Sequence, residues 1–181
     1  MQCYNGKDLA RAFRTVRANT IQIAEEIPED KYGFRPAEGT RTVAETLAHL
    51  VTATGWPEYL HGKRLSALTF ELFSGHMQQA AAAAAKLTTK AQLVDALRAE
   101  GDKFAAFLES LPDEALAEQV QYPAGMQPPQ KSRFEMLLST KEHEMHHRAQ
   151  LMVIERMLGI VPHLTRHMQA RMAEVAQAQK A

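Results

Sequence analysis

The sequence has only one cysteine, Cys3, so no disulfide bond can form within the chain. A lone cysteine fits a reducing compartment. No apolar run approaches the roughly 18 residues that are needed to span a bilayer, and the first residues lack the apolar stretch of a signal peptide. We therefore expect a cytoplasmic protein without a membrane partner.

The chain also lacks an excess of charge of either sign, because 21 basic residues are balanced by 21 acidic residues. Nucleic-acid binders draw much of their affinity from neutralising phosphates and usually carry a basic excess. The balance predicts no nucleic-acid partner. Hydrophobic residues make up 45% of the 181 residues, and this length suits one domain with a sizeable core. We expect a single domain over residues 1–181.

No segment shows the period-2 alternation of β-branched residues that is typical of strands, so no strand is predicted. Helical patterns are abundant instead. Capping boxes that begin at Thr42, Thr89 and Ser132 mark three helix starts, and Gly159 marks a helix end. The predicted helices span residues 8–26, 42–62, 71–85, 89–111, 132–158 and 162–177.

These patterns predict an all-α fold, a four-helix bundle with an extra short helix over residues 71–85 and a C-terminal helix over residues 162–177. The connection between the second and third long helices covers residues 63–88. A connection of this length has room for a crossover, so the order of the helices around the bundle stays open.

The predicted helix over residues 132–158 carries two histidines where a bundle normally places leucine. Counted back from its end at spacings of three and four, the inward positions are Leu158, Ile154, Leu151, His147, His143, Thr140 and Met136. Because His143 and His147 are four residues apart, they stack on one face and can bind one metal ion from a single turn. The alternative is a pair of core histidines that form hydrogen bonds with each other or with Glu and Gln.

A metal ion needs a further ligand, and His49 is the best-placed candidate, because it lies in the middle of the second helix beside its apolar face. A neighbouring helix that runs antiparallel or crosses can bring it level with His143. The alternative is a surface residue, since Leu47 and Leu50 define the apolar stripe better. For the other histidines, we expect His146 beside the ligands or on the surface, His61 and His76 in solvent, and His163 and His167 at the surface or an interface.

Residues 143–147 also match the H-E-x-x-H pattern of zinc metalloproteases, in which Glu144 would be the general base. Such a protease needs an edge strand to hold an extended peptide, and no strand is predicted. A third ligand would have to come from Glu155, His163, His167 or Glu174. The metalloprotease is therefore the less favoured alternative.

Two segments resemble the DinB-like family, whose members are also described as DinB/YfiT metalloenzymes. The first is Thr-Val-Ala-Glu-Thr-Leu-Ala-His-Leu at residues 42–50. The second is His-Glu-Met-His-His-Arg-Ala-Gln-Leu at residues 143–151, and Gly159 and Pro162 follow it. Order, separation and chain length agree, so the resemblance covers nearly the whole chain. Ala149 departs from the glycine of many members, which affects close packing rather than ligation.

The resemblance implies a four-helix bundle in which His49, His143 and His147 bind a divalent ion. Nickel or zinc is the expected ion, with iron and manganese as further candidates, and a homodimer is the expected assembly. Related members include glutathione-, mycothiol- and bacillithiol-linked transferases and a maleylpyruvate isomerase, so a low-molecular-weight thiol is a candidate co-substrate. The family is named for DNA-damage induction, which does not imply DNA binding.

An ion held by three neutral imidazoles is a Lewis acid with open positions, and it deprotonates a bound water or thiol near neutral pH. Thiol S-transfer and hydrolysis of a small molecule both follow from this chemistry, and the residues do not separate them. Glu144 is the candidate catalytic residue, Glu142 is expected on a solvated face, and Trp56 and Tyr59 are candidates for a pocket wall. A stress-response protein that binds metal without catalysis is the alternative.

Overall fold

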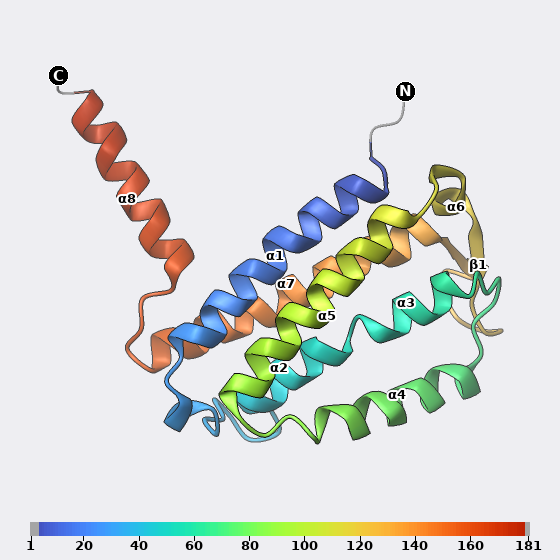
Figure 1. Ribbon diagram of the computed structural model, residues 1–181, viewed down its shortest axis with the longest axis horizontal. Helices are drawn as coiled ribbons and strands as arrows, with labels where there is room; N and C mark the ends of the chain where they lie inside the picture. Colours follow the sequence, from blue (N-terminus) through green and yellow to red (C-terminus); the bar gives the residue numbers. More distant parts are fainter. Residues whose placement is uncertain (1–3, 180–181) are drawn as a thin grey trace.

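A polar side chain caps the first turn of each of four bundle helices. In the computed structural model, which describes residues 4–179, these are α1 (Gly6–Glu26), α2 (Val43–Thr52), α5 (Lys90–Ser110) and α7 (Arg133–Met157) (Figure 1). Thr42, Thr89 and Ser132 form the predicted capping boxes, and Asn5 with Asp8 forms a fourth. Each box binds main-chain N–H groups that a first helical turn leaves free. The three predicted helix starts are confirmed.

The helices pair in parallel as well as antiparallel fashion. α1 and α7 run in one direction, and α2 and α5 run in the other (Figure 1). α3 (Gly55–Gly62) continues the path of α2, and α4 (Phe70–Ala84) then returns the chain to the end at which α5 begins. This return is the crossover for which the sequence left room. The predicted four-helix bundle with an extra short helix is confirmed.

The prediction of one unbroken helix over residues 42–62 was wrong, because the structure interrupts it at Ala53 and Thr54. Pro57 explains the interruption. It has no N–H to donate to the carbonyl of Ala53, four residues earlier, and its ring crowds that carbonyl. The helix therefore ends at Thr52 and begins again at Gly55.

The prediction that the chain forms no strand was also wrong. β1 (Gln119–Gln121) and β2 (Gln130–Ser132) form an antiparallel hairpin in which Val120 lies opposite Lys131. Three-residue strands are too short to show an alternating pattern, and only Val120 is buried. The short helices η1 (Glu29–Lys31) and α6 (Asp113–Ala117) complete the connections. The hairpin leads directly into α7 through Ser132.

The interior of the bundle contains two apolar clusters. The first joins α2 to the last turns of α1, the first turns of α5 and the second half of α7, and includes Ile23, Leu47, Leu97 and Leu151. The second joins the first turns of α1 to the end of α5 and the start of α7, and includes Leu9, Phe13, Phe104 and Leu137. Arg17 lies along α1 between these two clusters and is itself buried.

None of the helices between residues 4 and 179 is both long and apolar enough to cross a membrane. Cys3, the lone cysteine of the sequence, lies outside the described residues.

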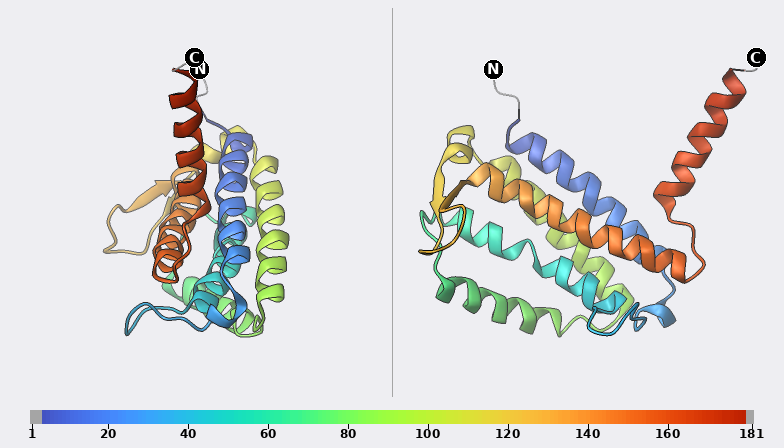
Figure 2. Two further views of the ribbon diagram at one scale, coloured as in Figure 1. Left: turned by 90° about the vertical axis from the view of Figure 1, so that its left-hand side faces the viewer. Right: turned by 180° about the vertical axis from the view of Figure 1, so that it is seen from behind.

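The chain turns sharply at the end of α7, where Gly159 has a φ of 80° and closes the helix as predicted. α8 (His163–Ala178) then leaves the bundle (Figure 2). His167 is exposed as expected, but His163 is fully buried and donates from Nε2 to Asn19 Oδ1 at 3.2 Å. Of the two positions expected for His163, the surface is excluded, because its ring is buried at the junction of α8 with α1.

Glu155 is fully buried at the same corner, and neither of its carboxyl oxygens has a hydrogen-bond partner among the described residues. Burial, together with the nearby negative charge of Glu26, raises the pKa of Glu155 to about 7, although Arg166 and Arg156 oppose the shift. The folded state therefore holds a proton on Glu155 at pH values at which the unfolded chain has already released it.

This proton makes stability depend on pH with a definite sign. Between about pH 4.5 and pH 7 the folded state binds more protons than the unfolded state, so the free energy of unfolding falls as the pH rises. Glu155→Gln removes the titration. Relative to the parent protein, this variant is expected to gain about 2–3 kcal/mol of stability between pH 5 and pH 8.

Urea denaturation at both pH values measures this difference. Glu142→Gln is the matched control, because it makes the same substitution at an exposed position of the same helix. The prediction is contradicted if the difference in free energy of unfolding between Glu155→Gln and the parent is the same at pH 5 and at pH 8.

Candidate metal centre

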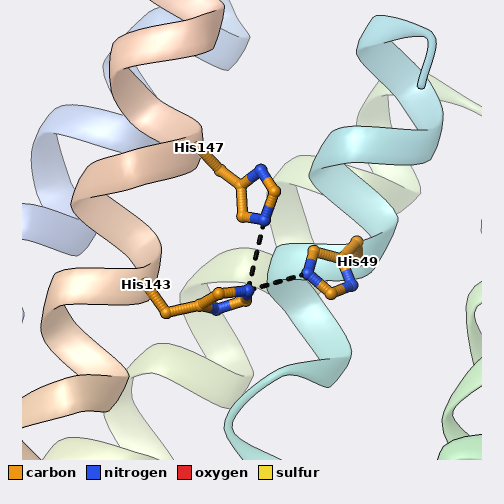
Figure 3. Close-up of side chains that lie close together, drawn as sticks. All are labelled: His49, His143 and His147. Carbon is orange, nitrogen blue, oxygen red and sulfur yellow. Dashed lines mark hydrogen bonds between the residues drawn. The ribbon is translucent and has the colours of Figure 1, made fainter. Parts of the chain in front are cut away.

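Three histidine rings converge between α2 and α7, two helices that run antiparallel and touch (Figures 1 and 3). His49 comes from α2, and His143 and His147 come from successive turns of α7. The Nε2 atom of His143 lies 3.0 Å from that of His49 and 3.2 Å from that of His147. Each of the three residues offers one ring nitrogen within 4.8 Å of those of the others, and no further such group occurs among residues 4–179.

This spacing fits a shared ion. Ligand atoms at about 2.0–2.1 Å from a tetrahedral zinc ion are about 3.3 Å from each other, close to the two short separations between the imidazole nitrogens. Hydrogen bonds among the three rings alone do not use every lone pair on the ring nitrogens. The Nδ1–H of His147 donates to Gln150 Oε1 at 2.8 Å, so in a neutral ring its Nε2 presents a lone pair to the centre of the group.

The surroundings keep the three imidazoles neutral. Burial, and to a smaller extent the charge of Arg41, lower the pKa of His49 to about 4. Burial is also the main cause of the lowered pKa values of His143 and His147. Neutral imidazole is the form that binds metal ions, so the site is ready for a cation without first losing protons at neutral pH.

The histidines border three cavities, of which two differ clearly in character. One, of about 340 Å³, is lined by His49, His143, Trp56, Phe73 and Met136 and is largely apolar. The other, of about 790 Å³, is lined on the far side of His147 by Arg35, Arg41 and Gln150. The third, of about 560 Å³, touches His49 alone of the three histidines. Each of the three histidines therefore borders open space.

The expected pocket aromatics are partly found. Trp56 lines the apolar cavity, whereas Tyr59 stacks on Trp56 at 6.2 Å between ring centroids and is 40% exposed. Tyr59 supports the cavity wall from outside.

Glu144 follows His143 on α7, about 100° further round the helix, and lies in the core of the bundle. Its carboxylate is 2% exposed and accepts two hydrogen bonds from Arg17, from Nε and Nη2, both at 2.8 Å. Arg17 also donates to the carbonyls of Leu97 and Leu50. Among the described residues, Arg17 is the partner in every hydrogen bond of this carboxylate. The geometry therefore favours a structural role for Glu144 over the catalytic role expected from the sequence.

The inward positions of α7 differ from the predicted ones in its first half. Met136, Thr140 and His143 are only half-buried. The buried residues of α7 are Arg133, Leu137, Glu144, His147, Leu151, Ile154 and Glu155. From His147 the buried stripe continues three residues back, to Glu144, rather than four residues back. The pattern counted back from Leu158 therefore assigned a core position to His143, which is half-buried, and left out Glu144, which is buried.

Some of the remaining histidines lie where the sequence predicted them, and others do not. His146 is exposed, as expected, and its Nε2 accepts from Gln150. His76 is half-buried. His61 is 1% exposed rather than solvated, which corrects the expectation. The downstream residues that a metalloprotease would use do not join His143 and His147, because among residues 4–179 the third member of the group is His49.

Three further residues of the site were not found from the sequence. Gln150 fixes the ring of His147, Arg17 holds Glu144, and Arg133 contacts His61. A signal was present for Arg17, because it falls four residues after Phe13 on the apolar face of α1. A cation in that position indicates a buried anionic partner.

Comparison with known proteins places these features in a family. The model of the DinB superfamily matches residues 12–151. The chain is 25% identical to the uncharacterized protein YjoA of Bacillus subtilis (strain 168) over 150 residues, which are 81% of this chain and 86% of YjoA.

Solved structures share the fold. The crystal structure of YjoA, a DinB-like protein from Bacillus subtilis, has a TM-score of 0.63 and 23% identity, covering 84% of this chain and 92% of that one. YfiT from Bacillus subtilis has a TM-score of 0.66 and 15% identity, covering 88% and 91%. YfiT is described as a probable metal-dependent hydrolase with an unusual four-helix bundle topology. At these identities the likeness concerns the fold.

The buried ion pair generates a prediction about stability. Arg17→Met leaves the carboxylate of Glu144 buried without a cation, which should lower the free energy of unfolding by about 3–5 kcal/mol. Combining Arg17→Met with Glu144→Leu removes both charges and should recover a large part of that loss. Urea denaturation of the parent, the two single variants and the double variant measures the coupling. Additive losses would show that the two side chains act independently.

The hydrogen bond from His147 to Gln150 generates a prediction about metal affinity. Gln150→Leu removes the acceptor that fixes the ring, so affinity for zinc should fall by about 10-fold, as for other residues that orient a metal ligand. Competition with a chromophoric chelator measures the change. His146→Ala is the matched control, because it contacts Gln150 only from the exposed side. Equal affinities in both variants would show that Gln150 does not orient the ligand.

Proposed function

The chain belongs to the DinB superfamily, and from this premise we propose that it is a metal-dependent enzyme in which His49, His143 and His147 hold one divalent ion. The observation that carries the proposal is the convergence of the three ring nitrogens within 4.8 Å beside an open cavity. The description of YfiT as a probable metal-dependent hydrolase supports it. Nickel and zinc suit a site made only of imidazole nitrogens, and iron is a further candidate.

The proposed reaction is thiol S-transfer to a small molecule or hydrolysis of one. A divalent ion bound by three neutral imidazoles supplies a Lewis acid, which lowers the pKa of a water or a thiol close to neutrality. Both reactions need the same activation, so they differ in the molecule that occupies the open position.

The chain's own residues supply orientation and selection. Gln150 holds the ring of His147 in the rotation that turns Nε2 to the centre. Arg41 is close enough for its positive charge to lower the pKa of all three histidines. The same charge attracts the carboxylate of a low-molecular-weight thiol into the cavity that Arg41 lines, while Trp56 and Phe73 give the other cavity an apolar wall.

A metal-binding protein without catalysis remains the second candidate, and the two candidates differ in one respect. A protein that only stores or senses an ion gains nothing from an apolar cavity beside its ligands, whereas an enzyme needs one for its substrate. The cavity of about 340 Å³ next to His49 and His143 therefore favours the enzyme.

Metal analysis of the purified protein tests the shared premise. We expect one ion per chain, and His49→Ala, His143→Ala and His147→Ala should each lower affinity by more than about 100-fold, since loss of a mere orienting partner typically costs 10–100-fold. His167→Ala, at an exposed position on α8, is the control and should retain full affinity. A protein that holds no stoichiometric metal, and whose affinity is unchanged in all three variants, would refute the site.

Turnover then separates the candidates. Glutathione with an aryl chloride as electrophile reports S-transfer, and 4-nitrophenyl acetate without thiol reports hydrolysis. Activity that follows metal content across the variants supports the enzyme. Stoichiometric metal without turnover in either assay supports the non-catalytic protein.

A further inference from the structure

His61 is a histidine that the metal centre does not use, and it lies in an unusual environment. It belongs to the last turn of α3 and is 1% exposed. Its Nδ1 lies 3.2 Å from Nη1 of Arg133, at the start of α7. Arg133 is fixed in turn by Glu118 Oε2 at 2.9 Å and by the carbonyl of Leu65 at 2.9 Å.

The contact with Arg133 determines which ring nitrogen carries the proton. A guanidinium has only donors, so Nδ1 of His61 must accept. A neutral ring then carries its single proton on Nε2. Burial keeps the ring neutral and lowers its pKa to about 3, and the positive charge of Arg133 acts in the same direction. His61 is therefore a neutral N–H donor at all pH values near neutrality.

This donor has no acceptor. Nε2 of His61 is buried and without a hydrogen-bond partner among the described residues. Leaving a buried donor unpaired costs about 1–3 kcal/mol, and such groups are rare in folded proteins. A ring that Arg133 holds firmly through its other nitrogen cannot turn away to relieve this cost.

The ring that carries this donor borders the apolar cavity beside the histidine triad. His61 lines this cavity together with Trp56, Phe73, Met136 and the ligand candidates His49 and His143. One cavity thus borders His49, His143 and His61, and its wall is mostly apolar. The hydroxyls of Ser139 and Thr140, which also line it, donate to carbonyls of α7. Its volume of about 340 Å³ is at the lower end of the range for small-molecule sites.

We propose that this cavity binds a substrate with a ring-sized apolar body and a neutral hydrogen-bond acceptor, such as a carbonyl oxygen, which accepts from Nε2–H of His61. The reactive end of the same molecule then faces the triad, and this part rests on the function proposed above. A neutral acceptor fits better than an anion, because one neutral donor in an apolar cavity does not offset the desolvation of a carboxylate. Arg133 does not supply the missing charge, since Glu118 already pairs with it.

Acetophenone and cumene are a matched pair of probes, because a methyl group of cumene replaces the carbonyl oxygen of acetophenone in a molecule of similar shape. Trp56 is the single tryptophan of the chain, so its indole N–H signal in NMR spectra reports binding in the cavity. The ratio of the two affinities is measured for the zinc-supplemented parent, for His61→Leu and for His61→Gln. Taking the ratio cancels the different hydrophobicity of the probes and any change of cavity shape that affects both alike.

The preference for acetophenone should fall by about 3–10-fold in His61→Leu, the range of one hydrogen bond. His61→Gln should keep most of the preference, because its amide oxygen can accept from Arg133 while its amide N–H faces the cavity. In the parent protein, the Nε2–H signal of His61 should shift downfield with acetophenone and not with cumene. This last measurement needs no variant, so it decides the question even where His61→Leu does not fold.

An equal ratio in the parent and His61→Leu, or a Trp56 signal that neither probe shifts, would overturn the proposal. The outcome is independent of the metal. If the protein binds no zinc while acetophenone still depends on His61, the proposed function fails and the binding site stands. If zinc is bound by the triad while the ratio does not change, the binding site fails and the metal centre stands.

Discussion

One buried guanidinium holds the four bundle helices together. Arg17 on α1 pairs with Glu144 on α7 and donates to main-chain carbonyls on α5 and α2. Even the backbone of α5 is adapted to it, because a Cβ atom at Gly101 would lie 2.8 Å from Cγ of Arg17. Apolar contacts tolerate sliding of one helix along another, whereas these directional hydrogen bonds form in a single register. The relative heights of the four helices therefore depend on Arg17.

The histidine triad inherits its geometry from that register. Leu50, whose carbonyl accepts from Arg17, follows His49 directly, and Glu144 follows His143 directly. The hydrogen bonds that hold Leu50 and Glu144 in the core therefore also fix the positions of their neighbours, His49 on α2 and His143 on α7. Separations of 3.0 and 3.2 Å between ring nitrogens require this precision, since an axial slip of one residue moves a side chain by about 1.5 Å.

The sequence predicted those features that depend on local chemistry. Capping boxes at Thr42, Thr89 and Ser132 and the i, i+4 spacing of His143 and His147 need only neighbouring residues to be recognised. The features that it did not predict depend on residues far apart in the chain. Glu144 is in the core because Arg17, 127 positions away, is opposite it, and His61 is buried because Arg133 covers one of its nitrogens. The interruption of the helix at Ala53 and Thr54 is different, because its cause, Pro57, lies in the local sequence.

The buried polar groups fall into two classes: those whose hydrogen-bonding atoms have partners and those that keep an unpaired donor or acceptor. The carboxylate of Glu144 and the guanidinium of Arg17 are fully engaged with each other and with main-chain carbonyls, which is what a structural pair requires. His61 differs, because its Nε2–H has no acceptor among residues 4–179. The ring nitrogens of the triad contact one another and Gln150, and they lie close enough together to bind one metal ion. Unused capacity costs stability. Not every unpaired group has a cavity beside it, because the carboxyl group of Glu155 is unpaired among the described residues at the corner of α7 and α8. The ring of His61 lines the cavity that His49 and His143 also line, so a ligand in that cavity can complete its bonding.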